Sequence, residues 1–408
     1  MKRATLFLAM ILALPLAARV RAVRSGDVDT PAAWLRQRAI RIDGTLSPFL
    51  RLVSNARIVA LGDATHGTHE LFASKQQLVP ALVDAGFRTI AFEAPYAEYA
   101  QLDDYIVHGS GDPAAALALA RYWFWDAQEV FDLLMWARAQ NAAGLTPPIR
   151  IAGVDPTAGA MRVVVDYLGR IDPAAAEEAQ ANYACMGASY RGDERCRSLI
   201  AGVRTSLASH PPSPELDEVL HAARIVEQSE RVAAGDRNAR DAAMAENLTW
   251  LAQRDRVVVL GHNEHWGRTD YVLQDPRPIR SAGSSLAATF GNDYFALGSA
   301  LLDGTFLAVE YLPGTFDGFI GAQQMTAPSP DDFARLLAQA RLDAMIVPLH
   351  APLPPWLAGT HRMRIAGSAV PSPDAATLDL PADFGAKFDA VLYLAHSTPS
   401  LLRHWPDI

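Results

Sequence analysis

The sequence predicts an α/β fold in which a mainly parallel sheet is flanked by helices and interrupted by an inserted helical subdomain. Four apolar runs, near residues 58, 89, 150 and 256, show no alternation with polar residues. Such runs are typical of strands buried on both faces. Helical periodicity separates the first three runs, and an almost wholly helix-like stretch, residues 173–254, lies between the third and the fourth. This order indicates βαβ units with a helical insertion between two strands of one sheet.

The first 22 residues have the pattern of a cleaved signal peptide. A basic start, Met1 to Arg3, precedes an apolar stretch over residues 4–14 that is too short to span a membrane. Small residues allow cleavage after Ala18 or Ala22, and no cysteine lies nearby that could carry a lipid anchor. We therefore expect a periplasmic or secreted protein without a stable membrane anchor.

The charge of the chain limits its partners. Removal of residues 1–22 takes away four basic residues and no acidic ones, so the formal charge changes from −9 to about −13. An acidic chain without a basic stripe is poorly suited to bind nucleic acid or anionic lipid, so a small molecule is the favoured partner.

The order of apolar runs and helix-like stretches predicts an α/β domain made of residues 23–172 and 255–408, with residues 173–254 as the insertion. It leaves the oligomeric state open.

Two cysteines, Cys185 and Cys196, lie in a glycine-containing stretch of the predicted insertion. In a chain bound for an oxidising compartment, such a close pair predicts a local disulfide that fixes a loop. A reactive thiol is the alternative, although neither cysteine has a histidine nearby in the sequence.

The remaining elements are read from periodicity and composition. Helices are predicted at residues 69–85, 113–121, 127–140 and 158–171, and further strands at residues 294–301, 305–311, 344–349 and 388–394. Residues 351–383 are rich in proline and alanine, which favours a long surface connection.

Acids and histidines follow the four apolar runs directly. Because the carboxyl ends of parallel strands meet at one edge of a sheet, where ligands of such folds bind, these side chains are expected to converge. The converging set is Asp63, His66, Glu93, Asp155, His262 and His265.

The densest cluster is GDATHGTHE, residues 62–70. Its glycines permit a tight turn that would hold His66 at the sheet edge, where a neighbouring carboxylate could poise the imidazole as a general base. The alternative is that His66, like Asp63 and Thr65, only caps the following helix. For His69 and Glu70, inside that helix, a structural role is as good an expectation as a functional one.

His262 and His265 repeat the arrangement after another strand. Two His-x-x-His pairs with Glu93 and Asp155 could bind a divalent metal, or they could act without metal, one histidine taking a proton from water and others donating to an oxyanion. Spacing does not separate these alternatives. The sequence lacks the Gly-x-Ser-x-Gly elbow, the phosphate-binding loop, Gly-x-Gly-x-x-Gly and His-Glu-x-x-His, which disfavours the corresponding enzyme classes.

Two further features could belong to the site. The aromatic run Tyr122 to Trp125 is either a rigid wall of a cleft or core packing, and Trp125 is the better candidate for ligand contact because Asp126 could cap the next helix. Arg240 and Asp241 begin a helix that leads to the His262 strand, where they could form a structural pair or join the site.

Five motifs in order resemble those of the erythromycin esterase family. They are GDATHGTHE (62–70), AFEA (91–94), YWFWDAQEV (122–130), RDAAMAENL (240–248) and GHNEH (261–265). The resemblance extends from about residue 30 to residues 397–399 and so covers nearly the whole chain after the signal peptide.

The resemblance implies a hydrolase that opens macrolactone esters with activated water and no covalent intermediate, on an α/β catalytic domain with added helices. It assigns the general base to His66 and the carboxylate after the next strand to Glu93, with His262 and His265 as the later histidines and Asp63 beside the base. Metal and other cofactors are not implied, so the expected partner is a small ester or lactone. Lys75, Trp125, Asp155 and Arg240 are the expected substrate-binding residues.

Two positions depart from the usual pattern of that family, which commonly has Glu at Asp63 and Arg at Lys75. A shorter carboxylate would sit back from the base, and lysine lacks the planar fork that a carboxylate prefers. These departures bear on the substrate more than on the chemistry. Two other function classes stay open: an exported haem- or metal-binding protein on a related fold, and a non-catalytic accessory protein of envelope-polysaccharide assembly.

Overall fold

The structure is a computed structural model that describes residues 30–120, 122–187, 189–273, 275–311, 318–350, 352–370 and 376–405. The predicted signal peptide lies outside these residues. Among the described helices, none is long and apolar enough to cross a membrane.

Within the described residues, eight strands form one sheet in the order β3-β2-β4-β1-β5-β10-β7, with β6 paired to β5. Neighbouring strands from β3 to β10 are parallel, whereas β7 and β6 run antiparallel to their partners. The mainly parallel α/β sheet predicted from the apolar runs is therefore confirmed. The strands are β1 (Ile58–Asp63), β2 (Thr89–Pro95), β3 (Arg150–Asp155), β4 (Val257–His262), β5 (Tyr294–Tyr311), β6 (Gly318–Gln324), β7 (Ala344–Pro348) and β10 (Ala390–Ser397).

The register of the central strands aligns their carboxyl ends. Asp63 on β1 lies opposite His262 on β4, and Phe92 on β2 lies opposite Leu260 on β4. The residue after Phe92, Glu93, thus reaches the same edge as His262. On the other side of β2, Pro95 lies opposite Asp155 of β3 after a shift in register.

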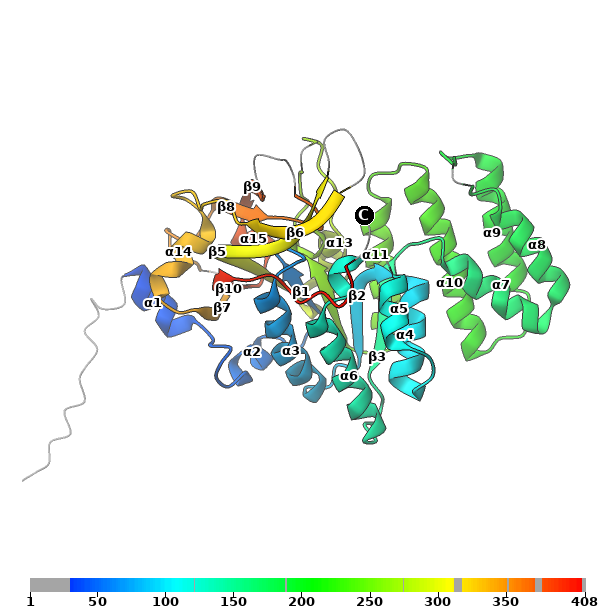
Figure 1. The fold of residues 1–408 in the computed structure, drawn as a ribbon, viewed down its shortest axis with the longest axis horizontal. Helices are drawn as coiled ribbons and strands as arrows, with labels where there is room; N and C mark the ends of the chain where they lie inside the picture. Colours follow the sequence, from blue (N-terminus) through cyan, green and yellow to red (C-terminus); the bar gives the residue numbers. More distant parts are fainter. Residues whose placement is uncertain are drawn as a thin grey trace, which may run out of the picture.

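Helices cover both faces of the sheet (Figure 1). Val59 and Leu61 of β1 pack into the core beneath the first group of helices, and Ile58 and Ala60 pack into the core on the opposite face. The first group is α2 (Ser47–Leu52), α3 (His69–Asp84), α4 (Tyr96–His108), α5 (Pro113–Leu119) and α6 (Gln128–Ala142). The opposite face carries α1 (Pro31–Arg38), α11 (Ala239–Ala252), α12 (Asn263–Trp266), α13 (Ala282–Phe290), α14 (Phe333–Leu337) and α15 (Phe384–Lys387).

Four helices lie to one side of the sheet and share a hydrophobic cluster of their own (Figure 1). They are α7 (Ala160–Ile171), α8 (Pro173–Tyr183), α9 (Glu194–Leu207) and α10 (Pro214–Ala233). Helix α7 shares this cluster although it lies before residue 173, the predicted start of the insertion. Helix α11 lies within the predicted insertion but packs on the sheet through Met244 and Leu248. The predicted boundaries of the insertion stay a prediction.

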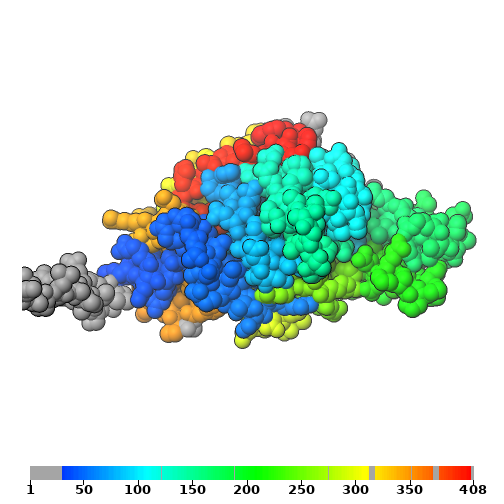
Figure 2. Space-filling model, turned by 90° about the horizontal axis from the view of Figure 1, so that it is seen from below, coloured from blue at the N-terminus to red at the C-terminus, as the bar shows by residue number. Residues whose placement is uncertain are grey.

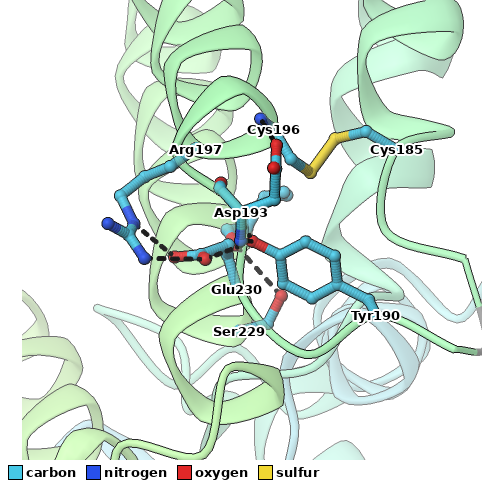
Figure 3. The surroundings of a disulfide bond; sticks show 8 residues. Cys185, Tyr190, Asp193, Cys196, Arg197, Ser229 and Glu230 are labelled. Atoms are coloured by element: carbon cyan, nitrogen blue, oxygen red, sulfur yellow. Dashed lines mark hydrogen bonds and ion pairs between the residues drawn. A yellow bond between two sulfur atoms is a disulfide. The ribbon is translucent and has the colours of Figure 1, made fainter.

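The predicted disulfide between Cys185 and Cys196 is present and joins the end of α8 to the first turn of α9 (Figure 3). Asp193 caps α9 by accepting a 2.8 Å hydrogen bond from the backbone N–H of Cys196. Tyr190 donates to the buried carboxylate of Glu230 on α10 at 2.5 Å, so the loop between the cysteines is tied to the neighbouring helix as well.

Two predictions of local structure differ from what the structure shows, and some helices were not predicted at all. Residues 294–301 and 305–311 form one 18-residue strand, β5, because Gly304 adopts a φ of +111° that lets the strand leave one partner and pair with β6. Residues 351–383 are not only a surface connection: β8 (Thr360–Ile365) and β9 (Leu378–Asp383) form a two-stranded sheet with Met363 and Ile365 in the core. Helix α4 was not predicted, since its buried positions are interspersed with charged residues.

Candidate active site

A cavity of about 1610 Å³ opens at the carboxyl edge of the sheet. His66, Glu93, Arg240, His262, Glu264 and His265 lie at its polar end. Apolar and aromatic side chains from several distant parts of the chain form much of the remaining wall, among them Leu117, Tyr122, Phe124, Val309 and Ile365. Such a combination of apolar walls and a few convergent polar groups is typical of small-molecule sites.

His66 lies in the turn after β1 and is only 4% exposed. Its ring stacks on Phe124, with centroids 4.1 Å apart, and its Nε2 lies 4.0 Å from Oε2 of Glu93. Gly67 is required beside it because a Cβ there would lie 2.1 Å from the carbonyl oxygen of Leu307. Burial lowers the pKa of His66 to about 4, more than the nearby Glu93 carboxylate raises it. The imidazole is therefore neutral at neutral pH.

Glu93, on β2, is the carboxylate on which the polar groups converge. Oε2 accepts a 2.8 Å hydrogen bond from the backbone N–H of His262, and Oε1 accepts one of 2.8 Å from Arg240. Burial alone would raise the pKa of Glu93, but His265, Arg240 and His66 together hold it well below its usual range. Gly261 permits this approach, since a Cβ there would lie 2.7 Å from the Glu93 carboxylate.

Arg240, at the start of α11, links the ends of β2 and β3 to α12. Its Nε and Nη2 donate to the two oxygens of Asp155 at 2.7 and 2.6 Å, in the paired geometry that a guanidinium favours. Nη2 also donates to Glu93, and Nη1 lies 3.0 Å from Nε2 of His265. Tyr122 donates a further hydrogen bond to Asp155 at 3.0 Å. Asp155, predicted to bind substrate, does not line the cavity but binds Arg240, which does.

His265 and His262 have different surroundings. His265 is held by Asp241, whose Oδ1 lies 2.9 Å from Nδ1, while Nε2 lies between Arg240 and Glu93. Burial lowers the pKa of His265, but Asp241 and Glu93 raise it by more, so the net shift is upward. Of the two alternatives given for Arg240 and Asp241, the structure shows no pair between them: Arg240 binds Asp155 and Glu93, and Asp241 holds His265.

His262 ends β4, and its Nδ1 accepts a 3.4 Å hydrogen bond from the backbone N–H of Glu264. The proton of a neutral ring therefore lies on Nε2, which has no hydrogen-bond partner among the described residues. Burial and the neighbouring His66 lower the pKa of His262 well below its usual value. The structure thus offers a neutral N–H donor at the polar end of the cavity.

Asp63 and Lys75 form a buried ion pair, with Lys75 Nζ 2.5 Å from Oδ2 of Asp63. Burial raises the pKa of Asp63 to about 6 and lowers that of Lys75, although each partner opposes the shift of the other. Neither residue lines the cavity, so Lys75 is placed behind the site rather than against a ligand. The two positions that depart from the family pattern are therefore partners in one contact.

Trp125 is fully buried, and its indole N–H donates to the backbone carbonyl of Glu93 at 2.8 Å. It packs against Phe72 and Phe92, whereas the preceding Phe124 lines the cavity and stacks on His66. The aromatic run thus contributes both to the wall of the cavity and to the core. Its short 3₁₀ turn, η2 (Trp123–Trp125), turns neighbouring side chains in different directions.

His69 and Glu70 lie away from the cavity. His69 Nδ1 is 2.6 Å from Oε1 of Glu129, and Glu70 accepts hydrogen bonds from the backbone and hydroxyl of Thr398.

Glu264 lines the cavity, although it was not predicted as a site residue. Its Oε2 lies 3.3 Å from Lys387 Nζ, and its Oε1 has no hydrogen-bond partner among the described residues. Within those residues, no group of three or more His, Cys, Asp or Glu side chains is arranged to hold a metal ion.

The chain is similar in sequence or in fold to several known proteins, two of which are erythromycin esterases. Erythromycin esterase type II of Escherichia coli is 24% identical over 318 residues, which cover 67% of this chain and 75% of that protein. The crystal structure of a Bacillus cereus protein superposes with a TM-score of 0.79 at 23% identity, covering 92% of this chain and 98% of the other. An erythromycin esterase EreC variant in its open conformation gives a TM-score of 0.68 at 16% identity, covering 88% and 96%.

At these identities the solved structures establish the fold alone. The family assignment rests on the sequence. The sequence model of the erythromycin esterase family matches residues 83–397, from the end of α3 to the end of β10. That range contains Glu93, Arg240, His262 and His265, and the match covers well over half of the chain. The chain therefore belongs to the erythromycin esterase family.

Proposed function

We propose that this protein hydrolyses a carboxylic ester or lactone of macrolide type with water activated by His66, without a covalent intermediate. The observation that carries the proposal is the position of His66, a neutral imidazole at the end of a large cavity with its Nε2 4.0 Å from the Glu93 carboxylate. This separation is too long for a direct hydrogen bond and suits a bridging water.

His66 is a better base than Glu93 in this surrounding. Arg240, His265 and the His262 backbone already stabilise the Glu93 carboxylate, which lowers its affinity for a proton. In the proposed step, His66 takes a proton from water as the water oxygen attacks the carbonyl carbon. The imidazolium then returns the proton to the leaving oxygen as the carbon–oxygen ester bond breaks. Glu93 orients the water and stabilises the imidazolium.

The negative charge that develops on the carbonyl oxygen needs hydrogen-bond donors. His262 supplies the Nε2–H, which has no other partner among the described residues. Arg240 lines the same end of the cavity, and its side chain is 33% exposed. His265 is engaged with Asp241, Arg240 and Glu93 and so holds the donors in place. In this arrangement, replacing His262 with alanine lowers kcat about 10²- to 10³-fold, with little change in KM.

The proposal extends to the location of the protein. The basic and apolar start of the sequence and the Cys185–Cys196 disulfide both support export to the periplasm or the exterior. A small-molecule ester is the proposed substrate, with macrolides as the first class to test because erythromycin esterase type II of Escherichia coli is among the relatives.

The experiment is a hydrolysis screen of macrolactones and simpler esters by mass spectrometry, with wild-type protein and His66→Asn. We expect water-dependent ring opening or cleavage by the wild type, and a 10²- to 10⁴-fold loss for His66→Asn. Intact-mass spectra of acid-quenched protein should show no acylated enzyme. His69→Asn is the matched control, because it removes the other histidine of the same motif, which lies away from the cavity.

Near wild-type hydrolysis by folded His66→Asn protein, or a stable acyl-enzyme, would contradict the mechanism. Unchanged ligand after long incubation would instead favour a binding protein.

A further inference from the structure

Residues 398–405, which we call the strap, leave the end of β10 (Figure 1). Near the end of the strap, His404 lines the cavity. In the space-filling view from below, the red C-terminal end of the chain borders the blue and teal surface of the α3 and α6 region (Figure 2). The strap begins with Thr398, whose backbone N–H and hydroxyl both donate to Glu70 at 2.7 and 2.6 Å.

The strap first binds the turn that carries His66, residues 64–68, which we call the His66 turn. The backbone N–H of Ser400 donates to the carbonyl oxygen of Gly67 at 3.0 Å, and Pro399 forms a bridge with Thr68. These contacts fix the backbone directly after the proposed base.

The strap then binds the segment that follows Phe124. The backbone N–H of Arg403 donates to the carbonyl oxygen of Asp126 at 2.9 Å. The Asp126 carboxylate accepts from His404 Nδ1 at 2.6 Å and from Arg403 Nη1 at 3.3 Å. Asp126 and His404 both line the cavity, whereas Arg403 does not. The strap therefore anchors the other side of the His66 ring, where Phe124 stacks.

Within the described residues, no hydrogen bond joins the His66 turn directly to residues 123–126. The strap donates to both, so it links the two segments between which the imidazole lies. We propose that the strap positions the general base, with Asp126, Arg403 and His404 as positioning residues that set the packing of Phe124 on His66. This inference rests on the proposed role of His66.

The expected consequence concerns the burial of the imidazole. If the contacts of Arg403 and His404 with Asp126 are removed, Phe124 no longer excludes water from His66. The pKa of His66 then rises from about 4 toward its ordinary value. The charged and titratable groups that face His66 are left in place by such a change. They come from β2, α3, α11, β4 and α12 and are Glu93, Lys75, Arg240, His262 and His265.

The test uses the double variant Arg403→Ala/His404→Ala in the full chain, with imidazole NMR titration of His66, assigned by comparison with His66→Asn. We expect an upward shift of the His66 pKa by about one unit or more, and a loss in kcat between about tenfold and a hundredfold. Arg403→Gln, which keeps part of the stem over Phe131, is the milder second variant, and circular dichroism checks the fold of both. It should shift the pKa in the same direction.

His396→Ala is the matched control. His396 also lies exposed with its Nδ1 2.6 Å from an aspartate, Asp303, but it is on β10 and does not line the cavity. It should leave the His66 titration and kcat unchanged. An unchanged His66 titration in both strap variants would overturn the inference, whether or not kcat falls. Because the titration needs no substrate, this result is distinguishable from a failure of the proposed hydrolysis.

Discussion

At the scale of single residues, the chemistry of this site depends on how burial and charge act on each histidine. His66 and His262 have lowered pKa values because both are buried, whereas the pKa of His265 is raised because Asp241 and Glu93 outweigh its burial. In the proposed mechanism these three histidines have different tasks: His66 accepts a proton, His262 donates from a neutral ring, and His265 holds the surrounding charges.

The first prediction concerns pH. A base acts only when it is deprotonated, so kcat/KM should rise tenfold per pH unit below the pKa of His66 and level off above it. Because burial lowers that pKa to about 4, the rise should be centred near pH 4 rather than near 6.5. A pH–rate profile between pH 3 and 8, with stability checked at each pH, measures it. A midpoint at or above the ordinary value for histidine would show that another group, or an exposed His66, limits the rate.

The second prediction concerns the buried pair of Asp63 and Lys75. Lys75→Met leaves the Asp63 carboxylate buried without its cation, which should cost about 3–5 kcal/mol of unfolding free energy. The double variant Asp63→Ala/Lys75→Met removes both charges and should recover much of that loss. Urea denaturation of the two single variants and the double variant completes the cycle. Additive losses would show that the pair is not coupled.

At the scale of elements, the site is assembled from the ends of β1, β2, β3 and β4 and the start of α11. The parallel register brings the strand ends together, and α11 adds the guanidinium of Arg240, which contacts Glu93, Asp155 and His265 at once. An element that is remote in sequence from the first strands therefore completes the charge balance of the site.

The third prediction concerns the disulfide of the α8–α9 loop. By the loop-entropy relation, a bridge closed over a separation of 11 residues should contribute about 2–3 kcal/mol to stability. The variant Cys185→Ser/Cys196→Ser should lose this stability and keep kcat, because neither cysteine lines the cavity. Thermal unfolding and steady-state kinetics test both parts. Two free thiols titrated in unreduced, periplasm-derived protein would refute the pairing.

At the scale of the whole molecule, the cavity gathers residues from position 66 to position 404. At its polar end each of three carboxylates already contacts a cationic or titratable group, since Arg240 contacts both Glu93 and Asp155, and His265 contacts Asp241. This local balance of contacts bears on whether a metal takes part, because side chains already paired with a cation are poor ligands for another.

The fourth prediction follows from that balance. Activity should survive dialysis against EDTA, and added zinc or manganese should not increase it. Metal analysis of the purified protein, run beside the assay, gives the second readout. Stoichiometric metal that co-purifies and is required for turnover would overturn the prediction and make His66, His262 and Glu93 candidate ligands.

The sequence alone was sufficient to predict the parallel sheet, the edge at which the acids and histidines converge, and the disulfide. Each depends on local information: an unbroken apolar run predicts a buried strand, and parallel topology brings the ends of such strands to one edge. A short sequence separation likewise favours the pairing of Cys185 with Cys196.

Only the tertiary structure decided which side chains face the cavity. The sequence favoured Trp125 for ligand contact, but the η2 turn buries it and presents Phe124 instead, because a 3₁₀ turn directs successive side chains to different sides. Lys75 lies behind the site because its cation pairs with Asp63. The strap bonds Gly67 and Asp126 across more than 270 residues, and no local pattern in the sequence encodes such a contact.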